Sequence, residues 1–429
     1  MAKRTKFTFI DLFAGLGGFH IAMDKLGGKC VFASELDPHL RNLYDLNFYD
    51  DSPFISGDIH KVQTESIPKH DVLCAGFPCQ PFNQAGKRNG LNDLNNGNHF
   101  YKIQEILDYH KPKYFILENV PNLKSHDNGK TWDVIEKSLS QLYNVYSGIL
   151  NPTEFGIPQN RRRFYIVGML KEDDFSLDWT FPKPKPRKTT IKSVIGLGKD
   201  ETPIIVKDTT RKQLDTWQEF LEYFEESGIP KFPIWASEFG ADYPYIDESP
   251  KFKSLKSFEN FKGSFGIPIN SWDDFPIYAR RDDRTFPQWK KIYIRKNREL
   301  WDENKEWLSG WVEKVKDFEH SHQKFEWNAG DNIASLKDRI IQFRPSGIRV
   351  KRNNASPALV LIGTQIPIVW DSEIDVFRYI SCREAARLQS FPEEHILPNS
   401  RMAAFRALGN AVNSHVVESI MADAIRKIK

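Results

Sequence analysis

A single cysteine, Cys79, lies in a loop that could hold a reactive thiol in place. The stretch CAGFPCQPFNQAG (74–86) follows a β-rich run, and Pro78 and Pro81 flank the cysteine. Proline fixes the backbone φ angle, so this pair restricts the loop and positions the sulfur. A thiolate is a strong nucleophile where its surroundings favour ionisation. We expect the other three cysteines to be buried and inert: Cys30, Cys74 and Cys382.

A glycine turn and a downstream acid indicate a second kind of chemistry. DLFAGLGGF (11–19) places Gly15, Gly17 and Gly18 where a strand turns into a helix, and glycine lets the backbone approach a ligand closely. Glu35 ends the next strand, where a carboxylate can bind ribose hydroxyls. Together they indicate a cofactor that contains a nucleoside. The dinucleotide fingerprint GxGxxG would need glycine where His20 stands, so nicotinamide is disfavoured.

Two further sets of polar residues lie near strand ends, where they could contact a ligand. Glu118 lies near the end of the run YFILEN (114–119), and QNRRRFYIVG (159–168) places Arg161 and Arg163 before and at the start of another strand. Arginines at this spacing suit phosphate or base contacts. From the residues alone, Glu118 could equally be a helix cap or a salt-bridge partner, and the arginines a solvated turn.

The pattern of apolar residues along the chain predicts the strands and helices that would position these residues. Five β-rich runs alternate with helical patterns. We predict strands at 7–12, 30–35, 71–76, 114–119 and 163–169. We predict one helix that follows the glycine turn and ends at about Leu26, and others at 38–48, 101–110 and 129–142. This alternation predicts an α/β fold with a doubly wound, mostly parallel sheet. Ligands bind at the carboxyl ends of the strands in such sheets, which is where Cys79, Glu118 and the glycine turn would lie.

Length and composition indicate more than one domain. The chain has 429 residues, a formal net charge of +3 and four cysteines. It contains no CxxC pair and no apolar stretch of membrane-spanning length, so we expect a protein of a reducing, intracellular compartment. After about residue 170 the chain becomes rich in tryptophan, lysine and arginine. We predict a first domain over 1–170, a second over 171–375, and a segment 376–429 that returns to complete the first.

Taken together, the motifs resemble those of the bacterial cytosine-C5 DNA methyltransferases. DLFAGLGGF is similar to the family's S-adenosylmethionine loop, GFPCQPF to its proline–cysteine loop, ENV to its glutamate motif and QNRRR to its Q-x-R-x-R motif. RYISCREAARLQSFP (378–392) and ALGNAV (407–412) resemble its two C-terminal motifs. The resemblance runs in the family's order over about 7–170 and 376–428. It implies a Rossmann-like methyltransferase sheet with a smaller target-recognition domain at 171–375.

The resemblance also implies roles for individual residues. Cys79 would add to C6 of a cytosine, Glu118 would bind its N3 and exocyclic amine, and Arg163 would bind near O2 while Arg161 supports the loop and nearby phosphate. The cytosine would be flipped out of the duplex. The residues implied for S-adenosylmethionine are Phe13, Gly15, Gly17, Glu35, Leu36, Asp58, Ile59, Pro78, Asn410 and Val412. No metal is implied. Four positions depart from the family pattern: Asn83, Arg162, Ala358 and Asn413.

The second domain would bind DNA in the major groove, where base identity is fully readable. Basic and aromatic residues interleave in three stretches, RRDDR (280–284), KKIYIRKNR (290–298) and FRPSGIRVKRNN (343–354). With the family glutamine, the predicted DNA-binding residues are Gln159, Arg280, Arg281, Arg284, Arg349, Lys351 and Arg352. We expect the helical pattern of 299–318 to be structural.

The sequence favours one function over three others. We expect a DNA (cytosine-5-)-methyltransferase of a restriction–modification system: a bacterial, cytoplasmic monomer that acts on double-stranded DNA, with a separate cognate endonuclease and no membrane partner. The transfer-RNA branch of the family is the first alternative, but its Cys-Phe-Thr signature is not found. A non-catalytic DNA-binding relative and a nicotinamide oxidoreductase are the others. The recognition sequence and the C5 proton acceptor stay open.

Overall fold

The chain divides by its contacts into two units. The computed structural model describes residues 5–49, 55–78, 98–171, 179–183, 188–199, 201–281, 283–359 and 365–425. The first unit comprises Met1–Glu201, Asn354–Gly363 and Ser381–Lys429, and the second comprises Thr202–Asn353 and Thr364–Ile380. By these contacts, 171–201 group with the first unit and 376–380 with the second, which differs from the boundaries that we drew at 170 and 375.

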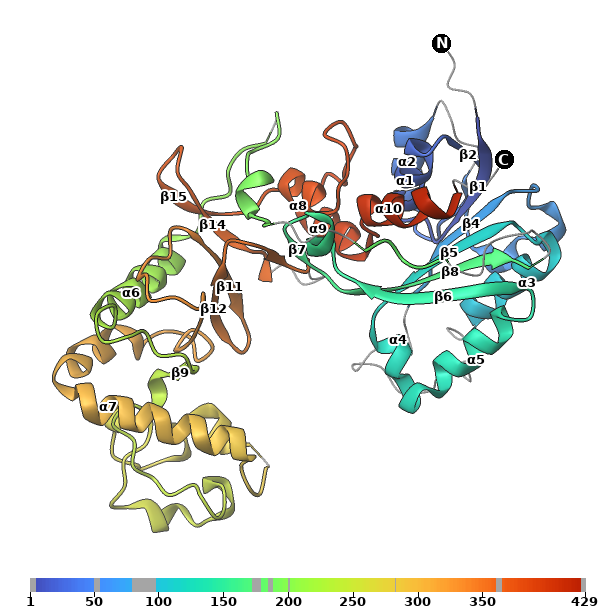
Figure 1. The fold of residues 1–429 in the computed structure, drawn as a ribbon. Helices are drawn as coiled ribbons and strands as arrows, with labels where there is room; N and C mark the ends of the chain where they lie inside the picture. The colour runs from blue at the N-terminus through green and yellow to red at the C-terminus, as the bar shows by residue number, and fades with distance from the viewer. Residues whose placement is uncertain are drawn as a thin grey trace. The chain divides into compact units, whose positions relative to one another are not determined.

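A seven-stranded sheet forms the middle of the first unit (Figure 1). Its strand order is β3-β2-β1-β4-β5-β8-β6. The first five strands of this order pair in parallel, whereas β8 runs antiparallel to both β5 and β6. The strands are β1 (Phe7–Leu12), β2 (Gly28–Ser34), β3 (Ile55–Ser56), β4 (Val72–Gly76), β5 (Tyr114–Asn119), β6 (Tyr143–Leu150) and β8 (Arg163–Leu170). The predicted doubly wound, mostly parallel sheet is confirmed.

Helices cover both faces of this sheet, because successive strand residues point to opposite faces and both faces are apolar. Phe9 and Cys74 pack on one face with α1 (Gly18–Lys25), α2 (Pro38–Phe48) and α10 (Ser414–Ile425). Ile10 and Leu73 pack on the other face with α3 (Asn98–His110), α4 (Asn122–Ser125) and α5 (Lys130–Leu139). Cys30 and Cys74 are buried, as expected, and Cys382 is half-buried.

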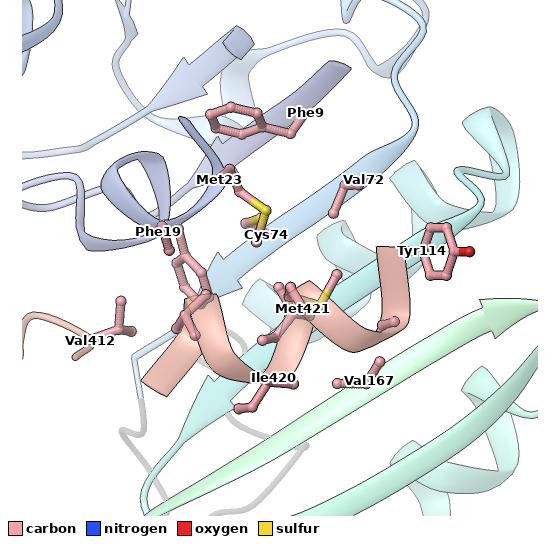
Figure 2. Close-up of a cluster of buried hydrophobic side chains, with 14 of the residues drawn as sticks. Phe9, Phe19, Met23, Val72, Cys74, Tyr114, Val167, Val412, Ile420 and Met421 are labelled. Atoms are coloured by element: carbon pink, nitrogen blue, oxygen red, sulfur yellow. The ribbon is translucent and has the colours of Figure 1, made fainter. Parts of the chain in front are cut away.

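The end of the chain completes the first of these layers. Ile420 and Met421 of α10 lie among Phe19, Met23 and Cys74 (Figure 2). Two separate helices lie in this part of the chain, because α9 (Arg401–Asn410) ends before Ala411 and α10 begins at Ser414. Asn413 causes the break, because its side-chain oxygen accepts a hydrogen bond from Val416 N at 3.2 Å and caps the new helix.

Two smaller elements complete the first unit. The short strands β7 (Gln159–Asn160) and β13 (Ser356–Pro357) pair in parallel, so the chain after the second unit's main segment returns to the Q-x-R-x-R segment. The helix α8 (Cys382–Leu388) begins with a capping box formed by Ser381 and Glu384. It occupies the stretch that the sequence predicted as helical.

The second unit is built around a six-stranded sheet in the order β15-β14-β11-β12-β10-β9. Its strands are β9 (Ile234–Trp235), β10 (Lys324–Asn328), β11 (Arg339–Arg344), β12 (Gly347–Arg352), β14 (Ile368–Asp371) and β15 (Val376–Tyr379). The helices α6 (Asp208–Tyr223) and α7 (Gln288–Val315) pack one face of it in an aromatic core that includes Trp217, Trp311 and Phe325. A satellite core around Tyr243, Phe258 and Phe275 lies beside the first half of α7. Among the described residues, no helix is both long and apolar enough to cross a membrane.

Candidate active site

The glycine turn between β1 and α1 adopts the backbone that glycine favours. Gly15 and Gly17 have φ angles of 55° and 80°, and Phe13, at 57°, is a rarer non-glycine example. A Cβ on Gly17 would lie 2.3 Å from Phe48 Cε2, whereas a Cβ on Gly15 would meet no atom of the described residues within 4 Å. Among these residues the space beside Gly15 is open to a ligand, and Phe13 has the kind of unusual conformation that clusters at ligand sites.

Glu35 closes this turn from the end of β2. Its Oε2 accepts a hydrogen bond from Gly15 N at 2.9 Å, and its Oε1 accepts one from Asp37 N at 2.9 Å. Each carboxylate oxygen can accept a second hydrogen bond, so the two oxygens of Glu35 can still bind two vicinal hydroxyls. Arg41 donates to the carbonyl oxygens of Glu35 and Leu36 at 2.8 and 2.7 Å, which fixes the neighbouring backbone.

An apolar platform and an acid lie beyond Glu35. Leu36 is 70% exposed, which is unusual for a leucine and suits a surface that an aromatic ring would cover. Asp58 caps a short 3-10 turn through His60 N at 3.0 Å, and Ile59 is buried beneath it. The sequence analysis missed His99, whose ring lies 5.1 Å from that of Phe13 and whose Nδ1 is 2.8 Å from His60 Nε2. Only its position at the start of α3, after the cysteine loop, could have pointed to it.

The C-terminal segment contributes one wall. Val412 is buried. A Cβ on Gly18 would lie 2.7 Å from Val412 Cγ2, and a Cβ on Gly76 would lie 3.5 Å from Val412 Cγ1. It therefore contacts both the glycine turn and the end of β4. Asn410 and Pro78 are exposed. The predicted cofactor residues thus line one end of the sheet, and their carboxylates and exposed apolar surface fit a ligand with a ribose and an aromatic base.

The reacting end of the site is built on β4 and β5. Asn119 Nδ2 donates to Phe77 O at 3.2 Å and so holds the chain that leaves β4. Cys79 follows two residues later and lies outside the described residues. Glu118 pairs in register with Gly76, so its carboxylate stands beside the strand that leads to the cysteine. This placement agrees with the strand-end position that the sequence predicts.

Glu118 is 6% exposed and forms an ion pair with Arg163, whose Nε lies 2.9 Å from Oε1. Burial raises the pKa of the Glu118 carboxyl above its usual value, although Arg163 and Arg161 lower it. A carboxyl with a raised pKa can hold a proton and donate it in a hydrogen bond. Within the described chain, Nη2 of Arg163 makes no hydrogen bond, so it is available to an acceptor.

Arg161 has a different role from the phosphate contact that we suggested for it. It is only 2% exposed, and its two terminal nitrogens donate to Gly409 O at 2.7 Å and to Ala411 O at 2.9 Å. These carbonyls end α9, so Arg161 fixes the C-terminal motif against the site. We therefore assign it as a positioning residue, and its burial argues against contact with a phosphate.

Gln159 was predicted to bind DNA, and its surroundings do not favour this. Its side chain is fully buried in β7, and neither amide atom has a hydrogen-bond partner among the residues that the structure describes. A buried amide needs a partner. The DNA contact of Gln159 therefore stays a prediction, and the sequence could not reveal this burial.

The basic residues of the second unit fall into two groups. Arg280 is held by Asp273 and by the carbonyl of Phe275, and Arg352 is held by the carbonyls of Ala329 and Gly330, so both are structural. Arg281 and Arg284 are exposed, Arg349 pairs with Glu326 at 2.6 Å, and Lys351 is half-buried without an ion pair in the described chain. The stretch 290–298 forms the start of α7, where Lys290 is buried and Arg298 pairs with buried Glu238.

Comparison with known proteins identifies the family. Over 231 residues the chain is 43% identical to the type II methyltransferase M.HpaII of Haemophilus parainfluenzae, covering 52% of this chain and 62% of that protein. The match therefore spans less than two thirds of the length of M.HpaII. The chain is also 46% identical to M.MspI of Moraxella sp., over 43% of the length of that protein. Over 433 residues it is 28% identical to M.BanI of Aneurinibacillus aneurinilyticus, covering 97% and 95% of the two chains.

The fold is also shared with a solved structure. The methyltransferase EhMeth of Entamoeba histolytica aligns over 98% of both chains with a TM-score of 0.52 and 15% identity, a likeness that concerns the fold. The sequence model of the C-5 cytosine-specific DNA methylase family matches residues 7–426, almost the whole chain. With the site at the strand ends in place, the chain belongs to the C-5 cytosine-specific DNA methylase family.

Proposed function

We propose that this protein is a DNA (cytosine-5-)-methyltransferase that transfers a methyl group from S-adenosylmethionine to C5 of a cytosine in a short duplex sequence. The observation that carries the proposal is the buried Glu118–Arg163 pair beside the strand that leads into Cys79. A base-recognising acid, a cation and a nucleophile at the ends of adjacent strands are what addition to a pyrimidine requires.

The chemistry begins at Cys79. Its thiolate adds to C6 of the cytosine, which breaks the aromaticity of the ring and makes C5 nucleophilic. A protonated Glu118 donates to N3 while its other oxygen accepts from the exocyclic amine, and this stabilises the electron density that moves onto the ring. Arg163, which lies beside Glu118, binds the neighbouring O2.

The remaining steps restore the ring. Bound S-adenosylmethionine would supply the methyl group: as C5 bonds to the methyl carbon, the bond to the sulfonium sulfur breaks and the neutral thioether S-adenosylhomocysteine leaves. Once C5 is methylated, a base removes the C5 proton, the electrons re-form the C5–C6 double bond, and the C6–S bond breaks to release the Cys79 thiolate. The protein holds the cofactor through Glu35 at the ribose, Leu36 and Ile59 at the base, and the backbone at Gly15.

The substrate is duplex DNA. C5 and C6 of a cytosine are stacked within the duplex, so the base must be flipped out to meet Cys79. The second unit, most of which falls in the predicted 171–375 domain, would recognise the target sequence. By its likeness to type II methyltransferases, we infer a monomer in the bacterial cytoplasm that protects host DNA from a separate cognate endonuclease.

Covalent trapping tests the proposal. Fluorine at C5 blocks the elimination step, so mixed-sequence duplexes that contain 5-fluorocytosine should remain attached to the wild-type protein on a denaturing gel when S-adenosylmethionine is present. The Cys79→Ser variant should give no such band. Trapping of a transfer RNA instead of DNA would favour the transfer-RNA branch of the family. Absence of any trapped species, despite binding of cofactor and DNA, would mean that the protein is a non-catalytic DNA-binding relative.

A further inference from the structure

Two histidines from separate segments meet beside the predicted cofactor residues, and we call them the histidine pair. Nε2 of His60 lies 2.8 Å from Nδ1 of His99, a hydrogen-bond distance, and the two ring centroids are 5.0 Å apart. His60 directly follows Asp58 and Ile59 in the chain. The ring of His99 lies edge-on to that of Phe13, with centroids 5.1 Å apart. His99 therefore joins two of the segments that would hold the cofactor, although neither histidine was predicted from the sequence as a site residue.

The bond between the two rings fixes the orientation of His99. His60 lies in a short 3-10 turn, Ile59–Lys61, which Asp58 caps by accepting from His60 N at 3.0 Å. Burial, with a smaller contribution from His60, lowers the pKa of His99 from its usual value, although Asp58 acts in the opposite direction. Two neutral imidazoles share a hydrogen bond by using one nitrogen each. Within the described residues, Nε2 of His99 makes no hydrogen bond, so it can donate to a ligand or accept from it.

Helix α3, which begins beside the histidine pair, is anchored to the same stretch at further points. Lys102 Nζ donates to Thr64 Oγ1 at 2.8 Å, and Thr64 Oγ1 in turn donates to Glu105. Nε2 of His110 lies 2.9 Å from Thr64 O. These contacts hold the helix in place without the histidine pair. We therefore expect the bond between the two histidines to affect the orientation of one ring more than the folding of the unit.

We propose that His99 contacts the adenine of S-adenosylmethionine and that His60 positions the His99 ring for this contact. The proposal rests on the proposed function for the identity of the ligand. Adenine presents an acceptor nitrogen beside its donor amine N6, so an imidazole nitrogen finds a partner in either tautomer. His60 is a positioning residue in this assignment, because it acts on the ligand only through His99.

A double-mutant cycle on cofactor affinity tests both parts of the proposal. Calorimetry on the full chain near neutral pH would give the Kd for S-adenosylmethionine and for S-adenosylhomocysteine, which share the adenine. His99→Ala should raise both Kd values about tenfold, and His60→Ala should raise them about three- to tenfold. Adding His60→Ala to His99→Ala should have no further effect, because the two residues act as one unit. His60→Gln should restore affinity, since an amide can still bond Nδ1 of His99.

His110→Ala is the matched control. His110 ends the same helix and bonds the same stretch through Thr64 O, and its ring lies 5.0 Å from that of His70. It lies about 16 Å along α3 from His99, so its removal should leave both Kd values unchanged. A similar rise in Kd in His99→Ala and His110→Ala would mean that the effect comes from folding, and it would overturn the proposal. Additive effects in the double variant would overturn the role of His60.

Covalent trapping distinguishes failure of this proposal from failure of the proposed function. A wild-type protein that binds both ligands and traps 5-fluorocytosine DNA, together with an unchanged Kd in His99→Ala, would overturn the assignment of the histidine pair alone. A wild-type protein that binds neither ligand and traps no DNA would overturn the proposed function, and the histidine pair would fall with it.

Discussion

Glu118 and Arg163 form a buried ion pair, with Oε1 and Nε 2.9 Å apart, at the end of the strand beside the cysteine loop. Replacing Glu118 with glutamine keeps the shape and a hydrogen-bond donor but removes the acidic proton and the charge that pairs with Arg163. We expect kcat for methyl transfer to fall by roughly 10²–10⁴, the usual contribution of one positioned acid. Single-turnover assays with tritiated S-adenosylmethionine would measure this.

The cofactor affinity of this variant provides its control. Glu118 lies at the reacting end of the site, so the Kd for S-adenosylmethionine, measured by calorimetry, should match that of the wild type. Unchanged turnover would show that the buried pair is only structural.

Arg161 should contribute to stability more than to chemistry. In Arg161→Met, two charge-assisted hydrogen bonds to the carbonyls of Gly409 and Ala411 are lost, and the buried carbonyls are left without donors. We expect the free energy of unfolding of the first unit to fall by about 3 kcal/mol in urea titrations. The neighbouring Arg162 is exposed, so Arg162→Met should change it by less than about 0.5 kcal/mol. Equal losses would contradict the assignment.

Gly15 tests where the cofactor lies. An added Cβ there meets no atom of the residues that the structure describes within 4 Å, so we expect Gly15→Ala to clash with a bound ligand. We expect the Kd for S-adenosylmethionine to rise at least about tenfold, a loss of about 1.4 kcal/mol. Gly228→Ala is the control, because Gly228 also has a positive φ, 102°, and open surroundings but lies in the second unit. Both variants should show a similar small loss of stability, so a loss of cofactor affinity in both would point to unfolding.

Acid should destabilise the first unit through His20. Burial lowers the pKa of His20 to about 3, and its ring stacks on Phe48 while Nδ1 lies 2.7 Å from the Tyr44 hydroxyl. The unfolded chain therefore takes up a proton near pH 6.5 while the folded protein does not, so stability present above pH 6.5 is lost as the pH falls. Between pH 6.5 and 4.5 the loss from this group is about 3 kcal/mol.

Replacing His20 separates its contribution to the pH dependence of stability from those of the other titrating groups. His20→Gln should flatten the fall in the free energy of unfolding over that range, as measured by urea titrations at several pH values. His395, whose pKa burial lowers to about 4, should leave a smaller slope in that variant. An unchanged pH profile would contradict the role of His20.

The sequence was sufficient where a local pattern decides the structure. The glycine turn, Glu35 and the strand that carries Glu118 lie where their motifs predict. The strand β6 was missed because its middle residues are only half-buried, and its pairing with β8 joins segments distant in sequence. For the same reason Arg280 and Arg352 looked available, although Asp273 and backbone carbonyls hold them.

The layer that α10 completes has a consequence for how the protein is made. The ribosome synthesises the strands of the first sheet before the second unit and α10 after it. At about 5–20 residues per second, the surface around Met23 and Cys74 waits for its cover for tens of seconds. A chain cut short by a premature stop codon in the final helices would expose that surface and be a target for proteolysis. This layer is therefore completed only after the second unit has been synthesised.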